Sequence, residues 1–334
     1  MVAYVGSRGV HQPFRVDDAD MALPTITSAG YLWDPNASRL NDNYGSIRGM
    51  FYQGRSYFNA LELQLAKRMS HGFQLQGTFT WGKSMDTSSA TVAGDAFGNS
   101  ISSLNWFDMR LDRGLSDFNV GRTLVVNGTW DIPTAKSFSG PEKWIADGWE
   151  LGLILTVSDG VPFTPTWGTG DDPALTQNND DWAFPNRLGG PGCKTLTNPG
   201  NPNNYIKTQC FAIPTAPDAA FFTANNCQGG DLTNLQCFNL RGNAGRNILS
   251  GPGITNLDFS VFKNNRIKRI SENFNVQFRA EIFNILNHPN FAPPTVPDSS
   301  DIFLSDGTLS GGAGLLTRTT IPERQIQFAI KFIF

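Results

Sequence analysis

The sequence predicts an all-β fold, a transmembrane antiparallel β-barrel with long extracellular loops. Three observations predict it: alternating apolar and polar side chains, connections that are alternately short and long, and aromatic residues near the strand ends. Alternation with period 2 places successive side chains on opposite faces of a strand. Because lipid cannot satisfy free backbone groups, a sheet that spans a membrane must close into a barrel.

The clearest strand is the C-terminal segment 325–334, in which every second residue is apolar. The apolar face of this segment consists of Ile326, Phe328, Ile330, Phe332 and Phe334. The same alternation predicts strands at 57–67, 73–82, 122–132, 149–158, 255–263 and 274–286, with a further strand at 1–8. Each is close to the length of about ten residues that a tilted strand needs to cross a bilayer.

The polar faces of these strands carry long hydrogen-bonding side chains, whereas the apolar faces hold few polar atoms. This contrast is typical of a barrel whose outer side meets lipid and whose inner side meets water. The residues expected to face the lumen are Gln74, Gln76, Gln277, Arg279, Glu281, Gln325 and Gln327.

The connections indicate the direction of each strand. Three of them are short or moderate, at 69–72, 133–148 and 263–273, and three are long, at 83–121, 159–255 and 287–323. If the C-terminus lies on the periplasmic side, every long loop falls outside the cell, as in outer-membrane barrels. Trp130 and Trp149 then lie at the periplasmic interface with Phe334, whereas Trp81 lies near the other end of its strand. We expect ligand contacts on the long loops.

Composition excludes several other classes of protein. Charged residues are 16% of the chain, against about 25% in typical soluble domains. A net charge of −3 provides no basic surface for nucleic acid, so no nucleic-acid partner is expected. No apolar run is long enough for a transmembrane helix, and the segment 1–8 lacks the features of a signal peptide.

The four cysteines, Cys193, Cys210, Cys227 and Cys237, all fall within the long connection 159–255. An even number of cysteines in a loop outside the cell predicts disulfides, and four cysteines allow three pairings. Pairing of sequence neighbours is favoured because short loops close at low entropic cost. A zinc site is the alternative, but no Cys-x-x-Cys spacing exists in the chain.

No constellation of residues points to catalysis, so we expect neither an enzyme nor a cofactor. The segment 77–84 has the Walker A spacing of a phosphate loop but lies inside a predicted strand. The histidines lack a cysteine, serine or acid at catalytic spacing: His11, His71 and His288. Four aspartates lack the spacing of a calcium loop, which favours a solvated acidic segment: Asp171, Asp172, Asp180 and Asp181.

Five blocks of the sequence resemble the barrel of Oar-like TonB-dependent transporters. They are GNAGRNILSGPG at 242–253, NLDFSVFKN at 256–264, FRAEIFNILNHPNF at 278–291, YFNALELQLAKRMSHG at 57–72 and AYVGSRG at 3–9. A further block, DRGLSDFNVGR at 112–122, departs from the family pattern. Asn119 replaces an acid and Gly121 a basic residue, so the resemblance carries no salt bridge to these two positions.

The resemblance implies a receptor in the outer membrane of a Gram-negative bacterium that takes up a large solute with energy from the TonB complex. Such transporters carry a signal peptide, a regulatory-like domain and a plug ahead of a barrel of about twenty-two strands. We therefore expect the chain 1–334 to be the C-terminal portion of such a barrel, with Met1 an internal or artefactual start. The implied partners are outer-membrane lipid, TonB through the missing plug, an extracellular solute, and the barrel-assembly machinery, which reads the terminal Phe334.

Two other functions remain open from the sequence. A secreted soluble β-sandwich that binds a ligand also has alternating strands, because one face of each sheet is buried against the other. A small outer-membrane barrel with a structural or adhesive role is the second alternative, since barrels of eight strands exist.

Overall fold

Eight long strands dominate the computed structural model, which describes the chain except residues 90–104, 135–139, 178–182, 268, 273 and 295–299. The long strands are β1 (Val2–Val16), β4 (Gly49–Ser70), β5 (Phe73–Asp86), β7 (Arg122–Asp131), β8 (Trp149–Ser158), β14 (Ile254–Arg266), β15 (Asn275–Phe283) and β17 (Gln325–Ile333). They pair antiparallel in chain order, and β6 (Gly114–Leu115) adds to the end of β5. The predicted all-β fold and its strands are confirmed.

The remaining elements are short. They are β2 (Thr25–Thr27), β3 (Gly30–Leu32), α1 (Gly140–Ala146), β9 (Pro162–Phe163), β10 (Thr166–Trp167), β11 (Asn186–Arg187), the 3₁₀-helix η1 (Thr208–Cys210), β12 (Phe211–Ala212), α2 (Ala219–Ala224), β13 (Leu249–Ser250) and β16 (Asp301–Phe303). No helix in the described part of the chain has the length and apolar character needed to cross a membrane.

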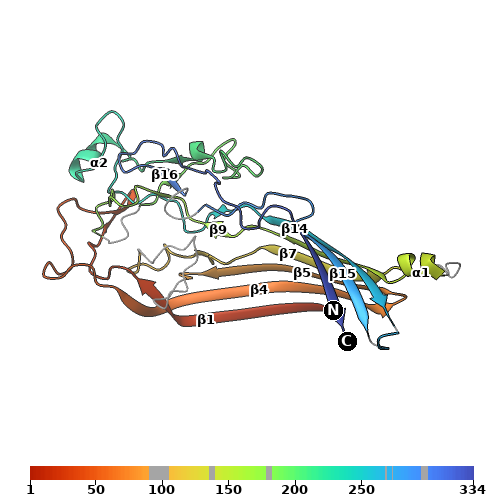
Figure 1. Ribbon diagram of the computed structural model, residues 1–334. Helices are drawn as coiled ribbons and strands as arrows, with labels where there is room; N and C mark the ends of the chain where they lie inside the picture. The colour runs from red at the N-terminus through yellow and green to blue at the C-terminus, as the bar shows by residue number, and fades with distance from the viewer. Residues whose placement is uncertain (90–104, 135–139, 178–182, 268, 273, 295–299) are drawn as a thin grey trace.

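The connections lie as predicted. Both termini and α1 are found at one end of the long strands, and the long loops with α2, β9 and β16 at the other (Figure 1). The tightest turn is His71-Gly72, where both residues have positive φ, 52° and 73°. A Cβ on Gly72 would lie 2.7 Å from the carbonyl oxygen of Asp131, so the close approach of two strands also requires glycine here.

One face of the sheet, which we call the outward face, is apolar across every strand. The register sets Leu61 opposite Trp81 and Phe79 opposite Leu124. At the C-terminal edge, five outward side chains are 56% to 87% exposed: Ile326, Phe328, Ile330, Phe332 and Phe334. Among the described residues no second sheet pairs with or covers these strands, so the soluble β-sandwich is not the fold of this chain.

The opposite, inward face is polar, and it holds all seven residues predicted to face the lumen. Gln76 lies opposite Asn127, Gln277 opposite Lys331, and Glu281 opposite Gln327. Gln277 Nε2 donates to Asn264 Oδ1 over 2.9 Å, and Arg279 Nε donates to Gln277 Oε1 over 2.7 Å. Hydrogen bonds to β14 and within β15 therefore engage Gln277 and Arg279 without burying them in a core.

Aromatic residues mark both ends of the outward face. At the end with the short turns, Trp130 lies opposite Phe73, and Phe334 packs 5.2 Å from Phe274 between ring centroids. Trp149 lies at the same end, opposite Lys263, whose Nζ donates to the carbonyl of Asp147 over 2.6 Å. The lysine stem thus covers apolar surface while its ammonium reaches polar groups at the turn. Trp81 lies at the loop end, opposite Arg122.

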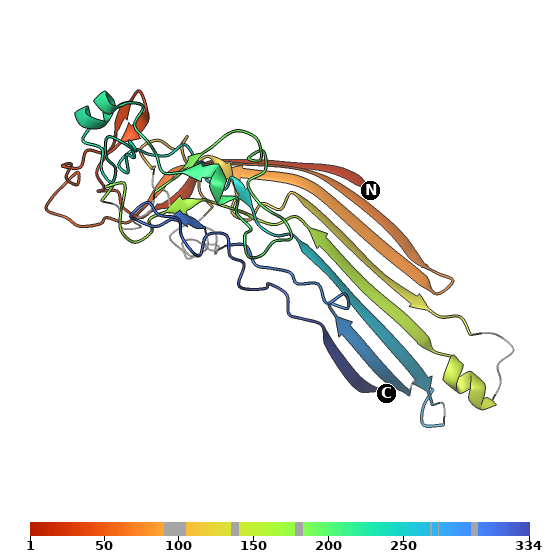
Figure 2. The ribbon, with the colours of Figure 1, turned by 90° about the horizontal axis from the view of Figure 1, so that it is seen from above.

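The sheet is open along both of its edges. Within the described residues, β1 pairs only with β4 and β17 pairs only with β15. Figure 2 shows the strands as one twisted layer, with the two terminal strands on opposite sides. The protein is therefore a curved wall of strands whose two edge strands retain unpaired backbone groups.

Two features of the sheet differ from the sequence-based expectation. The strand expected at 1–8 continues to Val16, and the strand expected at 57–67 begins at Gly49. They are joined by a fourth long loop, 17–48, which carries the hairpin β2–β3. The segment 77–84 is part of strand β5, which agrees with the rejection of a phosphate loop.

The two faces of β15 provide a direct stability test. Phe278 points outward and stacks 6.1 Å from Phe328 between ring centroids, whereas its neighbour Gln277 points inward. We expect Phe278→Arg or Val276→Arg to cost about 2–4 kcal/mol if the position lies near the bilayer midplane, because the guanidinium would then enter hydrocarbon. Urea unfolding in lipid vesicles measures this cost. Gln277→Arg is the matched control, and equal losses at the two faces would contradict the membrane-facing assignment.

Candidate functional site

The four long loops fold together into one structure at the loop end of the sheet, which we call the loop domain. It comprises residues 17–48, 87–121, 159–253 and 284–324, within the described part of each. Strand β10 of the third loop pairs in parallel with β16 of the fourth, and Leu32 bridges to Leu240. The loops are therefore mutually supporting rather than independent.

The buried apolar residues of the chain gather mainly in this loop domain. The largest cluster contains Phe163, Leu196, Tyr205, Ile206, Cys210, Phe211, Leu249, Ile302 and Leu316. A second cluster joins loop 17–48 to the third loop through Leu32, Ala216, Cys227, Cys237 and Leu240. The loop domain thus has its own hydrophobic core, outside the sheet.

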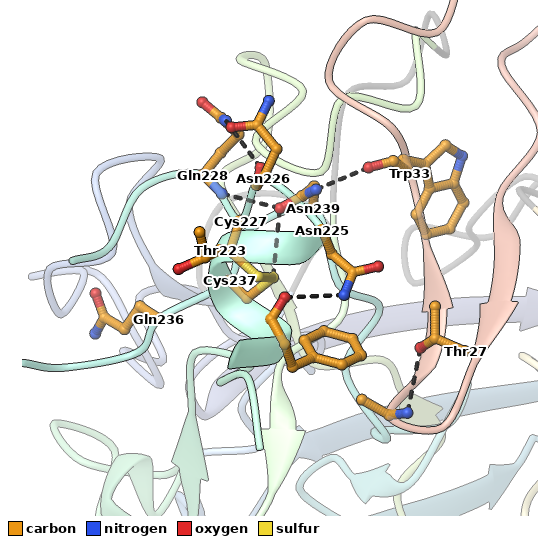
Figure 3. The surroundings of a disulfide bond; sticks show 12 residues. Thr27, Trp33, Thr223, Asn225, Asn226, Cys227, Gln228, Gln236, Cys237 and Asn239 are labelled. Atoms are coloured by element: carbon orange, nitrogen blue, oxygen red, sulfur yellow. Dashed lines mark hydrogen bonds between the residues drawn. A yellow bond between two sulfur atoms is a disulfide. The ribbon is translucent and has the colours of Figure 1, made fainter. Parts of the chain in front are cut away.

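Two disulfides tie the third loop, Cys193–Cys210 and Cys227–Cys237. This is the neighbour pairing that the sequence favoured. Around the second disulfide, Asn239 Nδ2 donates to the carbonyl of Trp33 over 2.8 Å, and Asn239 Oδ1 accepts from the amide of Gln228 over 3.0 Å (Figure 3). Asn239 therefore fastens the disulfide-closed segment to loop 17–48.

A buried ionic junction fastens the loop domain to the sheet. Arg246 forms salt bridges with Asp86, near the end of β5, and with Asp117 in the second loop, 2.8 Å from its Nη1. Its Nε also donates to the carbonyl of Asp112 over 2.9 Å. Because all three charged side chains are at most 4% exposed, these pairs are shielded from water and from salt.

The residues flanking this junction come from the block 112–122, whose departure from the family pattern left its role open. Asp117 also accepts from Asn247 Nδ2 over 2.6 Å. Asn119, which stands where the family has an acid, accepts a hydrogen bond from the amide of Ser84 over 2.7 Å. An uncharged side chain suffices there because the partner is a neutral backbone group.

A groove of about 610 Å³ lies where the three predicted long loops meet at the ends of β7, β8 and β14. We call it the rim groove. Its walls come from five segments and Leu316; the segments are 119–122, 158–160, 197–205, 250–253 and 288–291. On one wall, the guanidinium of Arg122 binds the carboxylate of Asp159 through two hydrogen bonds of 2.9 Å. Loops that are far apart in the sequence thus form one concave surface.

The rim groove offers many groups for hydrogen bonding. Glycine, proline and asparagine make up much of its lining, so backbone groups are accessible there. Tyr205 is buried beneath it, and its hydroxyl donates to the carbonyl of Ser250 over 2.8 Å. Burial raises the pKa of Tyr205 to about 12, so the phenol stays neutral. A polar solute would find donors, acceptors and one ion pair.

Of the four aspartates considered as metal ligands, Asp172 has a structural role. Asp172 accepts from the amide and hydroxyl of Thr176, both over 2.8 Å, and closes a local turn. Asp180 and Asp181 lie outside the described residues. Over the described part of the chain, no group of three or more metal-ligating side chains comes together. His288 lines the rim groove, whereas His71 lies in the turn between β4 and β5.

The sequence predicted the long loops but not the residues that connect them to the sheet. Arg246 lies in the recognised block 242–253, yet no role followed from it, because Asp86 is 160 positions away. The only sequence signal was composition, since an arginine in a loop rich in small and apolar residues needs a partner when buried. No feature of the sequence predicted the rim groove.

Comparison with known protein families gives a match over almost the whole chain. A family model described as an outer membrane beta barrel domain matches residues 1–327. No curated protein and no solved structure matches the chain. The matched region contains nearly the whole sheet and all four long loops, so the match concerns the full architecture rather than a single motif.

Removing the buried arginine tests the junction. Arg246→Met leaves Asp86 and Asp117 as buried carboxylates without their cation, which we expect to cost about 3–5 kcal/mol of loop-domain stability. Limited proteolysis of the loops along a urea gradient measures it. The matched control is Arg122→Met, which removes an exposed guanidinium from Asp159 and should have little effect. Similar losses in the two variants would contradict a structural role for burial.

The disulfides should protect the loops from proteolysis, and the sheet should fold without them. Each closes a short segment, with separations of 17 and 10 residues, for which chain entropy gives about 2–4 kcal/mol. We expect the double variant Cys193→Ser with Cys210→Ser to speed proteolysis within 188–240. The protein's heat-dependent shift in gel mobility, which reports the folded sheet, should stay unchanged. Loss of that mobility shift would show that the loop domain is needed for the sheet.

Proposed function

The chain belongs to the outer membrane β-barrel domain family and lies in the cell outer membrane, and from this we propose that it forms the barrel portion of a TonB-dependent receptor. The proposed activity is active uptake of a large solute across the outer membrane. The five sequence blocks that resemble Oar-like transporters support the finer assignment. The observation that carries it is an open wall of strands topped by a folded loop domain.

The open edges favour a larger barrel than these strands alone can form. In lipid, each unpaired backbone group costs several kcal/mol, so β1 and β17 need partners along their free edges. The two strands do not pair with each other among the described residues. We propose that further strands close the barrel and that a plug, which would contact TonB, fills its lumen. In this proposal residues 1–334 are the C-terminal portion.

The loop domain is the proposed site of solute contact. Its disulfides and buried ionic junction restrict loop motion, which lowers the entropic cost of binding. The rim groove offers accessible backbone groups and the Arg122–Asp159 pair, which suits a polar solute such as a siderophore, a glycan or a peptide. We propose no catalytic step and no cofactor for this surface.

The barrel-assembly machinery is the proposed partner of β17. Its outward residues are exposed, and every second residue along the strand is apolar. The strand also has one free edge. Both properties suit a segment that another strand must recognise by pairing and by side-chain pattern.

Uptake measurements test the proposal. Labelled ferric siderophores, oligosaccharides and oligopeptides are supplied to cells that lack the gene, lack TonB, or lack both. We expect one solute class to lose uptake to the same extent in all three strains, because receptor and energy source act in series. Uptake that needs the gene but not TonB would indicate a passive pore. Uptake that needs neither would favour a structural or adhesive barrel.

The rim groove has its own test within that assay. Arg122→Gln combined with Asp159→Asn removes both charges of an exposed pair and should leave the fold intact. For the solute found above, we expect a weaker apparent affinity and an unchanged maximal uptake rate, because energy supply is untouched. The matched control is Arg187→Gln, an exposed loop arginine that does not line the groove. Unchanged affinity in the double variant would remove the groove from the site.

A further inference from the structure

A second groove, of about 690 Å³, lies at the loop ends of β1, β4 and β5. We call it the basic groove. Four arginines, from β1, β4 and the loop 87–121, line it: Arg8, Arg55, Arg110 and Arg113. Tyr57 and Met85 contribute to its walls. No motif of the sequence predicted this site, since its residues come from separate strands and a loop.

The register places this groove on the outward face of the sheet. Arg8 lies opposite Tyr57, and Tyr57 lies opposite Met85. These positions have the same strand parity as Tyr4 and Leu61, which belong to the apolar outward face. The groove therefore begins where the membrane-facing surface ends, on the side of the long loops. Its place is the level of the lipid headgroups in the outer leaflet.

Charge in the basic groove is concentrated and uncompensated. The guanidiniums of Arg8 and Arg113 lie 5.4 and 5.9 Å from the centroid of the same ring, Tyr57. Within the described residues, no carboxylate oxygen lies within 4.0 Å of a side-chain nitrogen of Arg8, Arg55 or Arg113. Like charges that converge in this way repel one another, so an anion between them would be stabilised.

The other ionic groups of the groove do not neutralise the positive charge of these three arginines. Asp86 is already paired with Arg246 in the buried junction. Arg110 is neutralised by Asp108, with hydrogen bonds of 2.8 and 2.7 Å. These hydrogen bonds hold the pKa of the Asp108 carboxyl well below its usual range, so the pair persists at neutral pH. His11 lines the same groove.

We propose that the basic groove binds the headgroup phosphates of an outer-leaflet glycolipid. A planar guanidinium binds phosphate through paired hydrogen bonds, and three of them suit a headgroup with more than one phosphate. Val10, Met85 and Met109 line the groove beside the arginines, which suits the start of an acyl chain. On the outward face, one row of residues (Gly6, Asn59 and Lys83) separates the groove from the apolar row of Tyr4, Leu61 and Trp81. A lipid held at the arginines reaches hydrocarbon contact across that row, and a soluble anion does not.

This inference is independent of the transported solute. It rests on the outward face, and strands added at the free edge of β1 would extend the wall without covering that face. The rim groove and the basic groove share no lining residue, so the two binding sites can be tested separately.

The test measures binding of fluorescent diphosphoryl lipid A to the protein extracted from membranes into a non-ionic detergent. The variant is Arg8→Gln, Arg55→Gln and Arg113→Gln together, for which we expect affinity to fall by about tenfold or more. The matched control removes three exposed arginines at the opposite end of the sheet, Arg68→Gln, Arg266→Gln and Arg269→Gln. Its affinity should stay within about twofold of the parent, because the net charge is the same but the groove is intact.

Two further arms identify the source of the phosphate. Lipid A without its phosphates should bind about tenfold more weakly, and inorganic phosphate should not displace the lipid. Displacement by inorganic phosphate at the lipid's own concentration would make this a soluble-anion site and overturn the proposal. Equal binding of phosphorylated and dephosphorylated lipid, or equal affinity of the triple variant and the parent, would overturn it as well.

A single substitution keeps the test decisive if the triple variant does not fold. Arg55 is exposed and its side chain forms no ion pair among the described residues, so Arg55→Gln should fold normally. We expect it to weaken lipid binding about threefold, whereas Arg68→Gln should not. An unchanged affinity in Arg55→Gln would count against the groove, with gel mobility confirming the fold.

Discussion

The backbone hydrogen bond, in a solvent that cannot replace it, is the constraint on which this structure depends. A strand in hydrocarbon must pair along its whole length, which explains a sheet of eight long strands joined in chain order. The same solvent explains the outward side chains, since Phe328 and Ile330 are exposed without a protein partner covering them. In water, an apolar patch of this size would indicate a missing interface.

The sheet contributes little hydrophobic core, so the loop domain has to be stabilised by other means. It uses a compact apolar cluster around Ile206 and Leu249, two disulfides and the junction of Arg246 with Asp86 and Asp117. Because Asp86 lies near the end of a membrane strand, the junction fixes the orientation of the loops relative to the wall. Loop position and sheet position are thereby coupled through one buried guanidinium.

The end of the sheet that carries the long loops presents two chemically different grooves. The rim groove is lined by backbone-rich segments and one compensated ion pair, which suits a neutral or mixed polar ligand. The basic groove brings together three arginines without a carboxylate partner, at the loop end of the outward face. In the two proposals above, the rim groove serves a solute from the extracellular medium and the basic groove serves a lipid of the membrane.

The sequence alone determined the strands, their faces and the side on which the loops lie. Alternation at period 2 is a local property of extended backbone, so Gln277 and Phe278 could be assigned to opposite faces without any tertiary information. The cysteine pairing could also be predicted, because it depends on short separations along the chain. Loop 17–48, the Arg246 junction and both grooves could not be predicted, because they depend on contacts between segments as far apart as 160 residues. Those contacts are selected by packing and desolvation in the folded loop domain, and no local pattern encodes them.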